Sequence, residues 1–357
     1  MRGKIMKNSV KLFLLVTICC FFNVFPVDAV NSKELQKLGL VDLQVENNFF
    51  GLEDLNSQKT LEAAIQNNSY LPEEIMVTGI GAVRIPIIQG RYGLGFVLDG
   101  GGWGKIDNDL VKFYRDSKKP VTGAGKYYRL DGEYELYTTY GLYQSLTLPI
   151  GPANLVILGK LFNCSEYMHF KTNGQVFVEP SGNNQPSITV DGNYQREQMA
   201  AGSTGWGAGL GCELKLGSVD SWNIALVIDN LPGMVYLSKF QQETGKTDTD
   251  HILSPLNLSG IATESAAWVS LPLKLSGELN LPVWIGKIQL AGMMYGDLGE
   301  YSIGYLCPVY KELMLGGSYN PIMENLKVGL NWGESELSLY YGVESQQLTG
   351  LSLNFKF

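Results

Sequence analysis

The sequence is poor in the residues that usually carry catalysis or covalent cross-linking. Its 357 residues contain two histidines and five cysteines, and only 17% of them are charged. Two cysteines lie in the first 20 residues, so three remain further along the chain. An odd and sparse cysteine count is not a disulfide framework. Beyond the N-terminal region no apolar run reaches the roughly 18 residues expected of a membrane helix.

The first 29 residues have the pattern of an export signal. The stretch 12–25 is apolar but too short for a stable membrane helix, and Val27-Asp28-Ala29 has the small residues of a cleavage site. Ile18 stands before Cys19, where a lipid-attachment motif needs a small residue. We therefore predict a cleaved signal peptide over 1–29. The basic residues that precede the apolar stretch are Arg2, Lys4, Lys7 and Lys11.

The charge balance excludes one class of partner. Residues 1–29 carry four basic residues and one acid, so their removal lowers the net charge from −8 to −11. An acidic chain does not neutralise phosphates, and we expect no nucleic-acid partner.

Strict alternation of apolar and polar residues is the main structural signal. The C-terminal stretch 351–357 alternates and ends on an aromatic residue, and the stretch 206–216 places Trp206, Leu210 and Leu214 on one face. Glycine, Glu213 and Lys215 occupy the other face. The same period of two recurs around Ile224, Leu290, Val328 and Leu339. This pattern predicts half-buried β-strands.

The strands predict an all-β fold, an antiparallel transmembrane β-barrel of about 14 strands, with 12 as the alternative count. Long apolar faces with Trp or Tyr near strand ends favour a membrane barrel over a soluble β-sandwich, which also alternates. The turns near 333–334, 308–310, 280–282 and 218–220 are short and fall on one side, whereas 180–205 and 230–263 are long and fall on the other. Short periplasmic turns and long external loops are typical of such barrels.

Two regions depart from this pattern. Residues 30–74 are predicted to be a partly helical plug or periplasmic segment ahead of a barrel over 75–357, with a helix over 59–66. Residues 101–125 contain a short amphipathic stripe. Counting strands back from the C-terminus places that stripe on the periplasmic side, where a long excursion is unusual. Either the segment folds into the barrel, or the count is wrong there by one hairpin.

No motif in the sequence predicts catalysis or a bound cofactor. Gly245-Lys246-Thr247 lacks the first glycine of a phosphate-binding loop, because Phe240 stands there. No serine occupies a nucleophile elbow. The strand count places His169 near a periplasmic strand end and His251 in an external loop, so they would not share a site. We predict that the protein is not an enzyme and has no catalytic, cofactor or metal site.

Charged residues on the polar faces are the candidate lumen residues. They either pair across a wet lumen or line a path for a solute. Those predicted to face the lumen are Glu133, Glu135, Glu213, Lys215, Lys287, Lys327 and Glu336, with Lys274 and Glu278 on the same face.

These features resemble bacterial outer-membrane β-barrels. The strand count, the helical segment before the first strand, the stretch 206–211 followed by 224–231, and the terminal Phe357 are more distantly similar to the superfamily of long-chain fatty-acid transporters, PorV-like and TraF-like barrels. The small-residue opening and Asn-Pro-Ala element of that group are missing. The resemblance implies an outer-membrane location, contact with membrane lipid, and Phe355 and Phe357 as part of the signal read by the barrel-assembly machinery.

Three functions remain open at this point. The first is passive transport of a small, possibly hydrophobic, solute through the barrel, as a porin-like channel of the cell envelope. The second is a non-transporting barrel that scaffolds secretion or envelope machinery. The third is a secreted soluble β-sandwich that binds a ligand.

Overall fold

The computed structural model describes residues 39–52, 54, 63–66, 68–117, 125–179, 187–217, 222–248, 257–333 and 335–356. The predicted signal peptide 1–29 and the terminal Phe357 lie outside these residues. The described chain is almost entirely β-strand, and its strands belong to one sheet. None of the described helices has the length and apolar character needed to cross a membrane.

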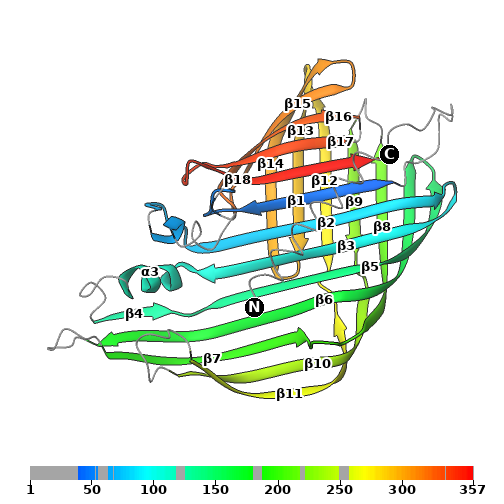
Figure 1. Cartoon of the computed structure of the whole chain (residues 1–357). Coiled ribbons are helices and arrows are strands. Elements are labelled where there is room, and N and C mark those ends of the chain that lie inside the picture. Colours follow the sequence, from blue (N-terminus) through cyan, green and yellow to red (C-terminus); the bar gives the residue numbers. More distant parts are fainter. Residues whose placement is uncertain are drawn as a thin grey trace. The chain divides into compact units, whose positions relative to one another are not determined.

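The strands follow one another along the chain with a single longer helix among them (Figure 1). The elements are β1 (Leu40–Asn47), β2 (Glu74–Ile88), β3 (Tyr92–Asp107), α3 (Asn108–Ser117), β4 (Lys126–Arg129), β5 (Gly132–Ile150), β6 (Ala153–Glu179), β7 (Ser187–Met199), β8 (Gly205–Gly217), β9 (Asn223–Asp229), β10 (Gly233–Asp248), β11 (Asn257–Ser270), β12 (Lys274–Val283), β13 (Gly286–Tyr295), β14 (Leu298–Tyr310), β15 (Leu313–Asn320), β16 (Asn325–Trp332), β17 (Ser335–Gly342) and β18 (Gln347–Lys356).

Antiparallel pairing closes the described strands into a barrel. β1 pairs with β2 on one side and with β18 on the other, which joins the two ends of the sheet. The first half of β6 pairs directly with β8, whereas its second half pairs with β7. β7 pairs with β10, and β10 returns to β8. β7 and β8 therefore follow one another along the same edge of β6, and β10 pairs with both. The described barrel has sixteen strands. β11 extends the wall beyond β10.

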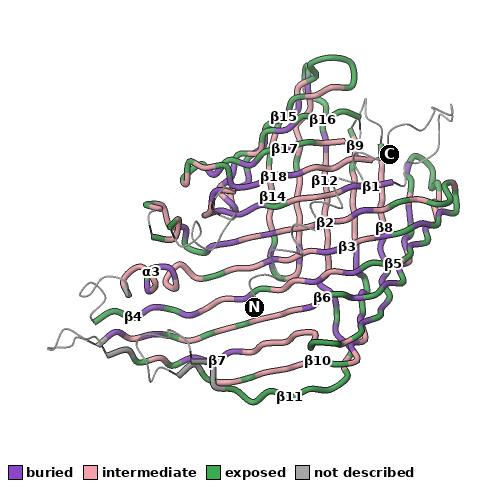
Figure 2. The backbone as a smooth tube through the Cα atoms, in the orientation of Figure 1, coloured by how far each residue is buried: buried purple, intermediate pink, exposed green. Residues whose placement is uncertain are grey.

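Alternation sorts the side chains between the outside and the interior of the barrel. On β8 the outward positions carry Trp206, Leu210 and Leu214, as their spacing predicts, while Gly209 and Glu213 point inward. Figure 2 shows the same alternation of buried and exposed positions along the other strands. Many outward apolar side chains are exposed, with Leu210 at 50% and Trp332 at 71%.

The two ends of the barrel differ in their connections. One end, called the short-turn end below, has tight hairpins at 151–152, 284–285 and 311–312, and the last strand ends there. The other, called the long-loop end, has α3 and the connection between β1 and β2. The predicted short turns lie at one end, within a few residues of their predicted positions, but the predicted long connections 180–205 and 230–263 consist largely of the strands β7, β10 and β11.

The predicted strand count of about 14 is too low, and the placement of residues 101–125 is wrong. The sequence pattern predicts two strands here, 154–171 and 175–179, but β6 runs without interruption from 153 to 179, through Gly174. Gly174, at φ 146°, lets the wall bend there while pairing continues. Because this region holds one strand fewer than predicted, every earlier strand runs in the direction opposite to the predicted one. Residues 101–117 and His169 therefore lie toward the long-loop end. Strands β7 and β10 were missed within segments expected to be long loops.

The segment 30–74 contributes to the barrel wall, in contrast to its predicted place ahead of the barrel. β1 within this segment completes the ring between β2 and β18. Only residues 63–66 of the expected helix are described, and they are helical. The following chain is held to α3, because Arg115 donates hydrogen bonds to the carbonyl oxygens of Ile65 and Asn68. The described part of the segment thus supplies one strand of the wall and a short helix held to α3 at the long-loop end.

Candidate functional site

A chain of buried ion pairs lies inside the barrel. Lys160 on β6 lies between two carboxylates, with its Nζ 2.9 Å from Asp99 on β3 and 2.7 Å from Asp229 on β9. Asp99 also accepts from Lys274 on β12, at 2.7 Å. The side chains of Asp99 and Lys160 are 4% and 3% exposed. Charges buried to this degree are stable only when each one has close opposite partners.

The turn after β9 supports this network. Asn230 adopts a left-handed backbone with φ 59°, which asparagine tolerates better than most residues. Its side chain accepts a hydrogen bond from Lys160 at 3.2 Å and donates one to the Tyr137 hydroxyl at 2.9 Å. The turn therefore contributes to closing the wall and to satisfying a buried ammonium group. We name Asp99, Lys160, Asp229 and Lys274 the central ion network.

A core of apolar side chains fills the barrel beside the central ion network. Fourteen buried residues form this core, and they come from strands and turns around the ring. Trp103 on β3 lies so close to Gly296, after β13, that a side chain there would collide with the indole ring. Arg84 on β2 adds a 2.5 Å ion pair with Glu213 on β8. Packed side chains therefore occupy the middle of the lumen.

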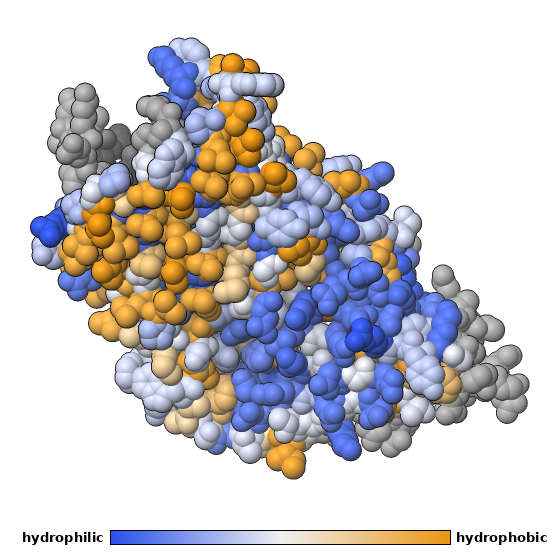
Figure 3. All heavy atoms as spheres, turned by 180° about the vertical axis from the view of Figure 1, so that it is seen from behind, coloured by the Kyte–Doolittle hydropathy of each residue, from blue (hydrophilic) through white to orange (hydrophobic). Residues whose placement is uncertain are grey.

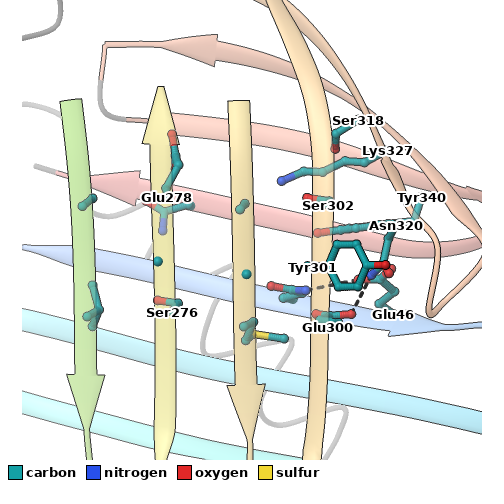
Figure 4. Close-up of a pocket in the computed structure, with 18 of the residues that line it drawn as sticks. Glu46, Ser276, Glu278, Glu300, Tyr301, Ser302, Ser318, Asn320, Lys327 and Tyr340 are labelled. Carbon is teal, nitrogen blue, oxygen red and sulfur yellow. Dashed lines mark hydrogen bonds between the residues drawn. The ribbon is translucent and has the colours of Figure 1, made fainter. Parts of the chain in front are cut away.

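A recess of about 270 Å³ lies on the other side of the interior. It is lined from β1, β9, β12–β18 and extends to Lys356, near the short-turn end. Figure 4 shows its polar side chains directed into the space. We name this cavity the lumen recess. Its lining includes Glu46, Ser276, Glu278, Glu300, Ser302, Ser318, Asn320, Lys327, Tyr340, Asn354 and Lys356.

Two carboxylates converge in the lumen recess from distant strands. Glu46 lies on β1 and Glu300 on β14, five strands apart around the ring, yet their side chains lie side by side (Figure 4). Asn320 donates to Glu300 at 2.8 Å, and Asn325 donates to Glu46 at 3.0 Å. These amides are neutral donors, so they orient the carboxylates without cancelling their charge. Lys327 is held by Glu336 at 2.5 Å.

A second polar cluster lies toward the long-loop end, beyond the apolar core. His169 faces two carboxylates, with Nε2 3.0 Å from Glu133 and Nδ1 3.6 Å from Glu197. Lys171 lies 3.1 Å from the other oxygen of Glu133. Burial raises the pKa of Glu133, but the hydrogen bonds from His169 and Lys171 outweigh it and hold that pKa below its ordinary value. This cluster joins β5, β6 and β7 by side-chain pairs across neighbouring strands.

The structure places all seven predicted lumen residues on inward positions, but it does not gather them into one site. Glu133 belongs to the long-loop cluster, Glu213 pairs with Arg84, and Lys327 pairs with Glu336. Glu135 accepts a hydrogen bond from the Trp103 ring nitrogen at 3.3 Å. The other two, Lys215 and Lys287, lie on inward positions of β8 and β13.

Of the central ion network, only Lys274 was predicted to face the lumen. Asp99, Lys160 and Asp229 were not singled out, and neither were Glu46 and Glu300 of the recess. Their signal was present in the alternation, since each is a charged residue at an inward position of a strand. Phe355, the described half of the expected assembly signal, lies at an outward position of β18, opposite Val41 of β1.

Comparisons with known proteins add little. No family model and no curated protein matches this chain. Among solved structures, the crystal structure of the Escherichia coli outer membrane protease OmpT is similar at 8% identity and a TM-score of 0.25, covering 92% of this chain and 100% of that chain. At that level of likeness, neither residue roles nor activity can be carried over. The closed antiparallel β-barrel is established by the strand pairing itself.

Proposed function

We propose that this protein is an outer-membrane β-barrel whose lumen is closed at its middle, so that it does not conduct solutes as an open pore. The observation that supports this most is the filled interior. The central ion network and the fourteen-residue apolar core occupy the level where a channel would need open space. The closed barrel also argues against the soluble β-sandwich considered from the sequence.

The outer surface supports a membrane location. Along β8 the outward positions stay apolar or small from Trp206 to Leu216, ten residues further on. At about 3.3 Å per residue and a strand tilt near 40°, this distance spans roughly 25 Å, the height of the apolar band of a membrane barrel. Trp206 forms an exposed aromatic group with Tyr236 and Trp268 at one boundary of this band.

Beyond that boundary the outer wall becomes polar. The outward positions of β7 and β10 there carry Arg196, Gln198 and Gln241, next to Glu243. Figure 3 shows a corresponding division of one face, with apolar residues gathered in one half and hydrophilic residues in the other. We infer that the long-loop end stands in water outside the cell and that the short-turn end faces the periplasm, as in barrels with short periplasmic turns.

The closed lumen has a clear energetic consequence. Opening a path would expose large side chains such as Trp103, Tyr137, Tyr295 and Leu237, each of which stabilises the folded state by about 1.5–3 kcal/mol through burial. Exposing four of them costs roughly 10 kcal/mol, before the ion pairs are counted. Thermal fluctuations do not populate such a state appreciably. This favours a non-transporting envelope barrel over passive transport.

Conductance across a planar lipid bilayer tests the proposal. The wild-type protein is expected to give no steady conductance, whereas Trp103→Gly combined with Tyr295→Gly removes two rings from the core and is expected to give measurable current. Tyr319→Gly, which removes an outward ring, is the matched control and should remain silent. Slower migration after heating verifies that each variant is folded. Steady conductance of the wild-type protein would refute the closed lumen.

A second candidate function is the binding of a small polar solute, and the lumen recess favours it. Its carboxylate, hydroxyl and amide lining fits a polar solute better than the possibly hydrophobic one first considered. Within this proposal the protein is not an enzyme. Incubation with peptide and ester substrates, followed by product analysis, tests that part, and turnover abolished by His169→Ala would contradict it.

A further inference from the structure

We propose that the lumen recess binds a small organic cation, a primary ammonium or guanidinium group, between Glu46 and Glu300. The inference goes beyond the closed barrel, because it concerns occupancy of the recess and does not depend on conductance. It rests on three features of the described residues: the charge of the lining, its hydrogen-bond acceptors, and the size of the space.

The charge of the lining is negative. Three carboxylates, Glu46, Glu278 and Glu300, face two ammonium groups. One of these, Lys327, acts electrostatically on both Glu46 and Glu300, but its ammonium group is paired with Glu336 at 2.5 Å. Glu46 is only 1% exposed and interacts electrostatically with Glu300 across the space. Two carboxylates held together away from water destabilise the fold, and one ammonium group shared with Glu336 compensates them only in part.

Hydrogen bonding leaves acceptor capacity in the same place. Glu300 receives one described side-chain hydrogen bond, from Asn320 to its Oε2, so its other oxygen remains open to a donor. Ser318 lines the recess, and the residue is only 5% exposed. Its hydroxyl can accept a hydrogen bond from a donor bound in the recess. An ammonium group has three donors, enough for both carboxylates and Ser318.

The size of the recess separates an organic cation from a metal ion. Its volume of about 270 Å³ is roughly nine times the share of one water molecule in the liquid, far more than a bare ion fills. It lies at the small end of the range for organic ligands. Within the described part of the chain, no group of three or more His, Cys, Asp or Glu side chains is arranged to hold a metal ion. These limits favour a cation with a short carbon chain.

Binding to the full-length protein in detergent micelles tests the inference. Propylamine and putrescine are the probes, and propionate and calcium chloride are the comparison solutes, measured by titration calorimetry and by the shift in melting temperature. We expect both amines to bind and to raise the melting temperature, and the comparison solutes to do neither. Glu300→Gln should weaken amine binding at least tenfold, while Glu312→Gln, an exposed acid at the short-turn end, should leave it unchanged.

A second variant keeps the test decisive. Ser318→Leu fills the recess without altering its charge and should also abolish amine binding, and heat-dependent migration verifies its fold. The inference is overturned if neither amine binds, if calcium binds in their place, or if Glu300→Gln binds amines as tightly as the wild type. If the wild type binds no amine and Glu300→Gln is more stable than the wild type, the two carboxylates share a proton and the inference is overturned. Since conductance is not measured, failure here leaves the closed-lumen proposal to its own test.

Discussion

Removal of one ammonium group from the central ion network should destabilise the barrel strongly. Lys274 lies 2.7 Å from Asp99, and their side chains are 13% and 4% exposed. Lys274→Met keeps a side chain of similar length but leaves Asp99 with Lys160 alone, which also serves Asp229. Two carboxylates then share one ammonium group, and the interior gains an uncompensated negative charge.

The magnitude follows from the geometry. At an effective dielectric constant of 20, two unit charges about 4 Å apart interact by about 4 kcal/mol. Breaking a buried pair by removing one partner typically costs about 3–5 kcal/mol, because the remaining charge stays buried. We therefore expect Lys274→Met to lower the free energy of unfolding by about 3–5 kcal/mol.

A double variant separates the charge effect from lost packing. Asp99→Asn added to Lys274→Met leaves Lys160 and Asp229 as a single neutral pair, so the second substitution should cost much less than it does in the wild type. The expected coupling energy between the two sites is about 1–3 kcal/mol. Urea unfolding in lipid vesicles, followed by tryptophan fluorescence, measures each free energy. A loss below about 1 kcal/mol for Lys274→Met, or additive effects of the two substitutions, would refute a buried network.

Three further predictions test the placement of the barrel. Leu210→Arg puts a cation on the apolar band near the bilayer midplane and should lower the free energy of unfolding by about 2–4 kcal/mol. Gly209→Ser, on the inward side, should lower it much less. Equal effects of the two variants on unfolding in vesicles would contradict the assignment of the two faces. Because the Glu133 pKa is depressed in the folded state, its contribution to stability is present above the ordinary value of 4.5 and is lost as pH falls through the lower folded value. Glu133→Gln should therefore flatten this part of the profile of melting temperature against pH. An unchanged slope would show that Glu133 is not the source of the pH dependence. In a cysteine-free background, Lys112→Cys on α3 should react with an impermeant maleimide on intact cells and Glu312→Cys only after permeabilisation; the reverse pattern would invert the orientation.

The fold class was predictable because alternation is strong on β8, β9, β16 and β17. In the proposed membrane location every outward position of the apolar band must be compatible with lipid. Outside that band the proposal places water next to the wall, where this rule no longer applies. β7, with the sequence SITVDGNYQREQM, has polar residues on both faces, and it was therefore taken for a loop. The same reason hid the second half of β10.

The candidate site was harder to predict than the fold. Alternation identifies an inward carboxylate, but it does not say which strand lies opposite. Glu46 and Glu300 are brought together by the closure of the ring through β1, which the sequence pattern had placed ahead of the barrel. The continuous path of β6 through Gly174 was also invisible to pattern alone, and it reversed the direction of every earlier strand. Register and closure, not composition, decide the partners in this lumen.

The unequal filling of the interior supports a functional reading of the lumen recess. On the side of β3, β5 and β6 the inward positions carry Val97, Tyr143 and Leu158, which pack into a small apolar core. On the side of β12 to β15 the inward positions include Ser276, Ala291, Ser302 and Ser318, which are too small to meet across the space. Larger apolar residues there would stabilise the barrel by about 25 cal/mol for each Å² removed from water. The chain instead places two carboxylates in that space. A local arrangement that lowers stability in this way is typical of a binding site.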